Sequence, residues 1–205
     1  MSTIEPAASE DTAEAHLGGG EEYESREFGF WLYLMTDAII FALLFATYVV
    51  YSGNIASGPD AKSLFDIGHV AGETLLLLLS SITFGFASLA SLTRQNREVI
   101  IWLLVTIVLG AGFVAMEIIE FAGMIAAGAG PDVSGFLSAF FTLVGTHGLH
   151  VSLGIVMIAV MIGQVATKGL TNPVKSRLYR LGLFWHFLDI VWIGIFSVVY
   201  LPGIM

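Results

Sequence analysis

Long apolar stretches alternate with short polar connections along most of this chain. Each stretch is about 24 residues or longer, and a helix of that length, rising about 1.5 Å per residue, crosses the roughly 30 Å hydrocarbon core of a bilayer. We therefore predict an all-α, polytopic membrane protein in which residues 27–205 form one transmembrane domain. Its five predicted transmembrane helices cover residues 28–51, 68–92, 99–124, 136–166 and 179–204.

The first 26 residues differ in composition from the rest of the chain. Seven of the 17 acidic residues fall there, together with the Gly18-Gly19-Gly20 run and few large apolar side chains. Such a segment cannot bury enough apolar surface to fold alone. We predict a disordered acidic tail over residues 1–26. An acidic start is also unlike the basic start of a secretory signal, so we expect the first apolar stretch to remain as a membrane helix.

The basic residues indicate the orientation in the membrane. If the helices alternate in direction, seven Lys and Arg residues fall on the side of the N-terminus and only Lys62 on the other side. Cytoplasmic loops carry the excess of basic residues in membrane proteins. We predict a cytoplasmic N-terminus and a periplasmic C-terminus. The seven residues are Arg26, Arg94, Arg97, Lys168, Lys175, Arg177 and Arg180.

Composition excludes several kinds of function. Hydrophobic residues make up 56% of the chain, and the mean hydropathy is +0.84, which leaves no room for a soluble catalytic domain. The formal net charge of −9 argues against nucleic acid as a partner. The sequence has no cysteine, which excludes disulfides, thiolate metal sites and c-type haem attachment on this chain.

Ionisable side chains within the apolar stretches are the candidate functional residues. A charged group at the bilayer centre costs about 2.5 kcal/mol or more, so such residues usually face other helices. Several are three residues apart and share a helix face. Their positions predict two polar layers, one central and one nearer the outer face. The eight residues are Asp37, Glu73, Glu117, Glu120, His147, His150, His186 and Asp189.

Three interpretations of this polar set remain open from its chemistry. The side chains can crosslink the helices by hydrogen bonds, with neutral acids and neutral imidazoles predominating. They can carry protons or ions, as intramembrane titratable groups do in pumps and transporters. They can also hold a metal, although residues spread over two depths do not form one ligand shell. His150 and His186 are in principle haem ligands, whereas His16 and His69 are expected to be solvated. We predict no metal, haem or catalytic residue on this chain.

Three segments carry a resemblance to a known family. They are the first helix from Phe28 to Asp37, the stretch from Gly130 to Val151 that contains Gly145-Thr146-His147-Gly148-Leu149-His150, and the stretch from Phe184 to Trp192. Together they resemble subunit III of haem-copper terminal oxidases over residues 27–205. Members from cytochrome c oxidases commonly have seven helices. Five helices and an acidic tail are most similar to the third subunit of cytochrome bo-type ubiquinol oxidases.

The resemblance implies a role in aerobic respiration. In such a complex, quinol is oxidised, oxygen is reduced to water and protons are pumped across a bacterial inner membrane. The resemblance implies that the haem and copper belong to a larger catalytic subunit I, while the third subunit has no redox centre. It implies packing against subunit I and other oxidase subunits, binding of phospholipid, and support of sustained turnover and proton uptake. Asp37 matches the buried carboxylate of the family's equivalent helix, and Glu120 matches a family glutamate.

A second functional class is a stand-alone proton-coupled transporter. Transporters often contain internal repeats and interrupted helices. The sequence shows no repeat and no proline in the middle of a predicted helix. We therefore predict an accessory subunit and keep the transporter as the alternative.

Overall fold

The computed structural model describes residues 7–53 and 67–204, and its regular secondary structure is entirely helical. Within these ranges, five helices are long and apolar enough to cross a membrane, which confirms the predicted class. They are α1 (Ala7–Tyr51), α3 (Ile67–Leu92), α4 (Asn96–Ala126), α5 (Gly135–Lys168) and α6 (Asn172–Ile195). A π-helical segment, η1 (Phe196–Tyr200), and the short α7 (Leu201–Ile204) continue α6.

Helix α1 begins inside the segment that we predicted to be a disordered tail. Its membrane-spanning part is Glu27–Tyr51, but the helix starts at Ala7. Alanine and glutamate are frequent between Ala7 and Glu27. Both are strong helix formers, which favours a continuous helix over this range. Residues 1–6 of the predicted tail and Lys62 lie outside the described residues.

The last transmembrane helix begins earlier than predicted. Helix α6 starts at Asn172, whereas the apolar pattern placed the start at residue 179. Pro173 occupies the first turn, where its fixed φ suits a helix and its missing N–H is not required. Lys175, Arg177 and Arg180, which we predicted at or near the connection, therefore lie in the first turns of the helix.

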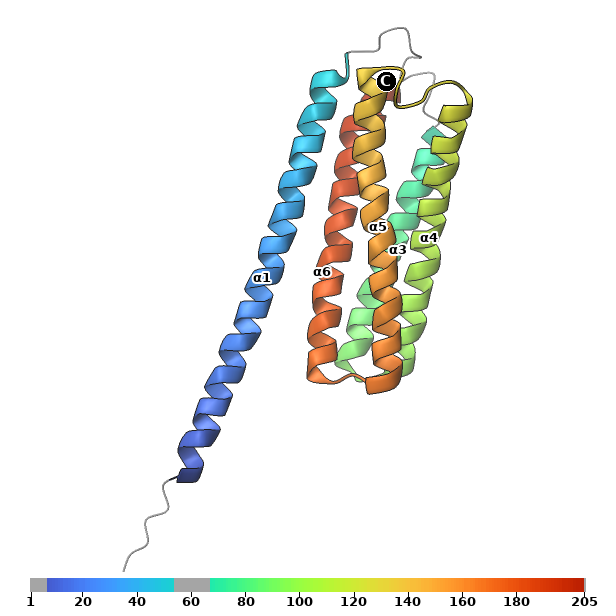
Figure 1. Cartoon of the computed structure of the whole chain (residues 1–205). Helices are drawn as coiled ribbons and strands as arrows, with labels where there is room; N and C mark the ends of the chain where they lie inside the picture. The colour runs from blue at the N-terminus through green and yellow to red at the C-terminus, as the bar shows by residue number, and fades with distance from the viewer. Residues whose placement is uncertain (1–6, 54–66, 205) are drawn as a thin grey trace, which may run out of the picture. The chain divides into compact units, whose positions relative to one another are not determined.

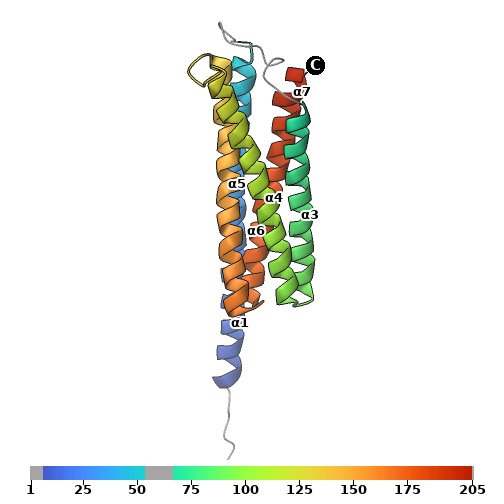
Figure 2. The ribbon, with the colours of Figure 1, turned by 90° about the vertical axis from the view of Figure 1, so that its right-hand side faces the viewer.

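The chain divides into two units, residues up to Ile39 and residues from Ile40 onward, which we describe separately. In the second unit, α3, α4, α5 and α6 form a closed ring. Helix α3 packs on α4 and α6, and α5 packs on the same two helices. Figures 1 and 2 show that successive helices of the ring run in opposite directions. We call the end with the α4–α5 connection the Gly130 end, and the end with the α3–α4 and α5–α6 connections the Gln95 end.

Two tryptophans of α6 fill the centre of the ring. Trp185 Nε1–H donates to Ser80 Oγ, and Trp192 Nε1–H donates to Thr74 Oγ1, both at 3.1 Å and both on α3. Glycines make room for the Trp185 ring, because a Cβ added at Gly110 or Gly154 would lie 2.9 Å from it. The indoles thus join α6 to the other three helices of the ring while their polar hydrogens remain bonded.

The part of α1 that belongs to the second unit packs against α5 and α6. Phe41 is 2% exposed, and its ring centroid lies 5.2 Å from that of His150 and 6.3 Å from that of Phe187. Further along, the Tyr48 ring lies 5.9 Å from Phe136. Residues 40–51 therefore form a fifth element beside the ring.

Candidate functional site

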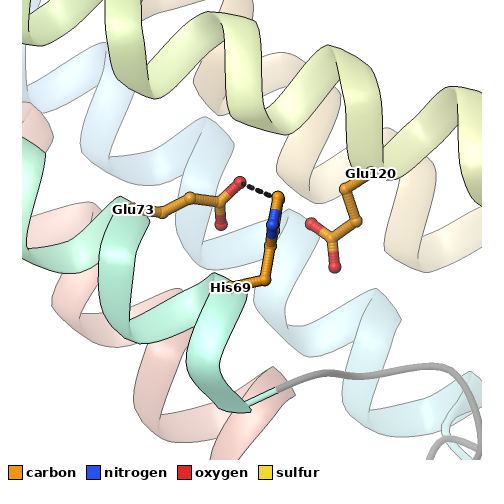
Figure 3. A group of neighbouring side chains, drawn as sticks. All are labelled: His69, Glu73 and Glu120. Carbon is orange, nitrogen blue, oxygen red and sulfur yellow. Dashed lines mark ion pairs between the residues drawn. The ribbon is translucent and has the colours of Figure 1, made fainter.

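A cluster of one histidine and two glutamates lies near the Gly130 end, between α3 and α4 (Figure 3). His69 and Glu73 are one turn apart on α3, and Glu120 comes from α4. One nitrogen or oxygen atom of each residue lies within 4.8 Å of those of the other two. His69 Nε2 is 3.4 Å from Glu73 Oε1 and 3.3 Å from the carbonyl oxygen of Met116. Figure 3 shows the imidazole between the two carboxylates.

Glu120 also has a partner from the last transmembrane segment. The Tyr200 hydroxyl, at the end of η1, donates a hydrogen bond of 3.0 Å to Glu120 Oε2. Tyr200 is fully buried, so this bond is shielded from water and holds the carboxylate in place. The cluster thereby joins α3, α4 and η1.

Glu117 and His147 lie in the neighbouring interior but face other groups. Glu117 is 4% exposed, and its carboxylate lies against Gly148 of α5, where a Cβ would collide with it. His147 is fully buried, with its ring stacked on Trp192 at 5.4 Å and edge-on to Phe113 at 5.8 Å. Among the described residues, neither ring nitrogen of His147 has a hydrogen-bond partner.

The more central groups do not form the predicted inward-facing layer. The His186 side chain is 46% exposed, which contradicts our expectation that it points into the bundle. Its Nδ1 lies 2.6 Å from Ser81 Oγ and 3.7 Å from Asp189 Oδ2. Asp189 is buried, and the residues three apart share one side of α6. The edge of the α3–α6 contact falls between the two residues. Asp189 is therefore covered, whereas His186 is exposed.

His150 lies on a different side of the bundle from His186. Its Nδ1–H donates to the Thr146 carbonyl oxygen at 2.7 Å, and its ring packs edge-on against Phe41 of α1. His186 instead packs against Phe84 of α3, at 5.9 Å between ring centroids. Since the two imidazoles have different neighbours, the structure does not bring together the pair that we considered as haem ligands.

Asp37 belongs to the first unit. Within that unit, the Tyr33 hydroxyl, one turn earlier on α1, donates a hydrogen bond to the Asp37 carboxylate. Because the two residues are four apart on one helix, Tyr33 supplies a hydrogen-bond donor to the carboxylate without a contribution from a second helix.

The position of His69 in this cluster was not predicted from the sequence. We expected this residue to be solvated at a helix entrance, but it is largely buried, with 28% of its side chain exposed, and contacts Glu73. The signal was available, because His69 and Glu73 are four residues apart and therefore neighbours on one helix face. Glu120 could not be added from spacing, since it lies on another helix.

Comparisons with known proteins all point to the third subunit of respiratory oxidases. Residues 21–204 match the family model described as cytochrome c oxidase subunit III. The chain is 58% identical over 177 residues to the cytochrome bo(3) ubiquinol oxidase subunit 3 of Pseudomonas putida, covering 86% of each protein. It is 51% identical over 193 residues to the protein of the same name from Pseudomonas aeruginosa, covering 94% of this chain and 90% of that protein. It is also 43% identical over 176 residues to quinol oxidase subunit 3 of Bacillus subtilis, covering 86% of each.

Proposed function

Because the chain belongs to the cytochrome c oxidase subunit III family, we propose that it is the accessory third subunit of a proton-pumping haem-copper oxidase that oxidises ubiquinol. One observation carries the proposal: the likeness to subunit 3 of a cytochrome bo(3) ubiquinol oxidase extends over 94% of this chain. Haem and copper belong to the catalytic subunit of such a complex. This chain binds that subunit in a bacterial inner membrane and supports its turnover.

The electron donor follows from the degree of identity. Identity is 58% to a relative named for ubiquinol and 43% to one named only for quinol. The test is the steady-state oxygen consumption of the purified complex with ubiquinol, menaquinol or reduced cytochrome c as the donor. We expect rapid oxidation of ubiquinol and negligible oxidation of cytochrome c. A preference for menaquinol or cytochrome c would contradict the donor assignment.

None of the relatives described above is named as a transporter. Reconstitution into liposomes distinguishes a transporter from an accessory oxidase subunit. The isolated chain in liposomes is expected to move no protons in response to an ion or solute gradient. The assembled complex is expected to generate a proton gradient when quinol and oxygen are supplied. Gradient-driven proton movement by the isolated chain would favour the transporter.

A groove beside α1 supports the proposed binding of phospholipid. It has a volume of about 360 Å³ and is lined by residues of α1 and of the beginning of α5. Apolar carbons and a few hydroxyl groups make up this lining, which suits an acyl chain that ends near a polar headgroup. The lining residues are Leu44, Thr47, Tyr51, Gly135, Ser138, Ala139 and Thr142.

Exposed His186 indicates the side that meets another subunit. This residue lies near the middle of the span Asn172–Tyr200, where acyl chains offer no hydrogen-bond partner to an imidazole. A polypeptide with a polar group at that depth satisfies the exposed part of the ring. Since the natural chain has no cysteine, single cysteines can test this side.

Ile190 of α6 lies one turn from His186 and is 68% exposed. Val108 of α4 has a similar exposure of 70%. In the assembled complex, we expect Ile190→Cys to crosslink to a partner subunit through a short lipophilic thiol reagent. Val108→Cys is the control and is expected to stay uncrosslinked. Equal yields at the two positions, or a yield only at Val108, would refute the assignment of this side.

A further inference from the structure

We propose that His69, Glu73 and Glu120 bind a divalent cation, Zn²⁺, near the Gly130 end of the helix ring (Figure 3). The haem and copper of the proposed oxidase are separate from this site. Zinc does not change oxidation state in proteins, so the proposal adds no redox centre to this chain. It does replace our expectation of no metal, which was based on the spread of the polar residues over two depths.

The positions of the three side chains fit one ion. Each residue offers one ligand atom, and these atoms lie within 4.8 Å of one another. Zinc binds histidine nitrogen and carboxylate oxygen at about 2.0–2.2 Å, which in a tetrahedral site leaves roughly 3.3–3.6 Å between ligands. Small rotations of two glutamate side chains bridge that difference. A histidine and a glutamate four apart on one helix, with a third ligand from a second helix, form an open site with room for water.

Glu73 supplies an independent reason for a ligand. Its side chain is fully buried, yet neither carboxylate oxygen has a hydrogen-bond partner among the described residues. His69 Nε2 lies 3.4 Å from Glu73 Oε1. This contact leaves a buried carboxylate without a hydrogen bond, and buried charges are normally hydrogen-bonded as well as paired, or bound to a metal. Figure 3 shows this carboxylate pointing toward the imidazole and the Glu120 side.

The distribution of charge also favours a cation here. Glu73 and Glu120 lie close together near the Gly130 end. Within residues 67–202, every lysine and arginine lies toward the opposite, Gln95 end. A divalent cation would neutralise Glu73 and Glu120 without requiring a lysine or arginine at this level.

The ligand types select zinc over the abundant hard cations. Mg²⁺ and Ca²⁺ prefer sites made only of oxygen ligands, whereas imidazole suits zinc. The Tyr200 hydroxyl, 3.0 Å from Glu120 Oε2, acts as a positioning group that orients one ligand. A bound ion would join α3 to α4, and through Tyr200 to η1.

The experiment measures zinc in the complete complex, purified through a tag on this chain. The complex is stripped with a chelator and titrated with Zn²⁺ alone, and the zinc content per chain is measured by mass spectrometry. We expect about one zinc per chain, with an absorption-edge spectrum showing nitrogen and oxygen ligands near 2.0–2.2 Å. Glu73→Gln and His69→Gln should each lower the affinity by about tenfold or more, and Tyr200→Phe by a smaller factor.

Glu117→Gln is the matched control, because it is the same substitution one turn from Glu120 on a side chain that faces Gly148. It should retain one zinc per chain. Absence of zinc from the natural complex would overturn the proposal, as would equal affinity in the His69→Gln and Glu73→Gln variants. If one variant does not assemble, the other decides. The haem content of the same samples tests the proposed function independently. Zinc is counted per copy of this chain, so its amount does not depend on whether haem is present.

Discussion

At the scale of single residues, the fit of Trp185 between two glycines determines how closely the helices approach. A Cβ at Gly154 would lie 2.9 Å from this ring, closer than side-chain atoms pack. The centre of the bundle therefore depends on the absence of a methyl group. Gly163, on the same helix, has no neighbouring atom within 4 Å of an added Cβ.

Gly154→Ala should lower the free energy of unfolding by about 1–3 kcal/mol, because overpacking forces the indole or the helices to shift. Gly163→Ala should cause no loss. The measurement is the thermal midpoint of unfolding of this chain within the detergent-purified complex. Equal midpoints for the two variants would show that Trp185 is not tightly enclosed.

Asp37 is the residue that we expect to support proton supply or coupling between subunits. It lies near the middle of its span, and Tyr33 donates a hydrogen bond to it. Asp37→Asn removes the titratable group while keeping the size, and we expect slower proton uptake and a shorter catalytic lifetime of the complex. Asp37→Glu restores a carboxyl group and should restore both. Unchanged turnover, pumping and lifetime in Asp37→Asn would reduce Asp37 to a packing residue.

At the scale of elements, the π-helical end of the last span determines where Tyr200 lies. In η1, the Leu201 N–H bonds to the Phe196 carbonyl five residues earlier. Pro202 has no N–H to donate to the Val198 carbonyl, which removes one bond of the regular helix and favours this wider turn. The wider turn rotates the end of the helix, and Tyr200 reaches Glu120 from there.

Tyr200→Phe should therefore destabilise the chain by about 1–3 kcal/mol, since a partly buried carboxylate oxygen loses its donor. Tyr179→Phe is the control, because Tyr179 lies on the same span with 59% exposure. The midpoint of thermal unfolding is the measurement. A loss in Tyr179→Phe as large as that in Tyr200→Phe would show that the bond to Glu120 contributes nothing.

The sequence predicted the elements better than the site. Apolar length alone identifies five spans, because the bilayer sets one minimum length for them all. The start of α6 depends on Pro173, and the π-helical turn depends on Pro202. A hydropathy pattern does not register either effect, so the sequence did not predict them. Spacing within one helix was enough to pair His69 with Glu73, a signal that we missed, whereas Glu120 required the packing of α3 on α4. The exposure of His186 likewise depends on where two helices meet.

At the scale of the whole molecule, the second unit is built on a helix ring whose interior holds several acids and an imidazole. Trp185 and Trp192 satisfy their polar groups within the ring, but His186 stays exposed near the middle of its span. Such a side chain is compatible with the membrane when another polypeptide covers it. The family likeness over residues 21–204 indicates that this polypeptide is another subunit of an oxidase.

The most direct test is an optical spectrum of what purifies with this chain. An affinity tag on the chain, extraction in mild detergent and one reduced-minus-oxidised spectrum are sufficient. The account predicts haem absorption at a constant ratio to the chain, carried by a larger polypeptide that separates from it on denaturing gels. A homogeneous chain that purifies alone and without haem would contradict the account.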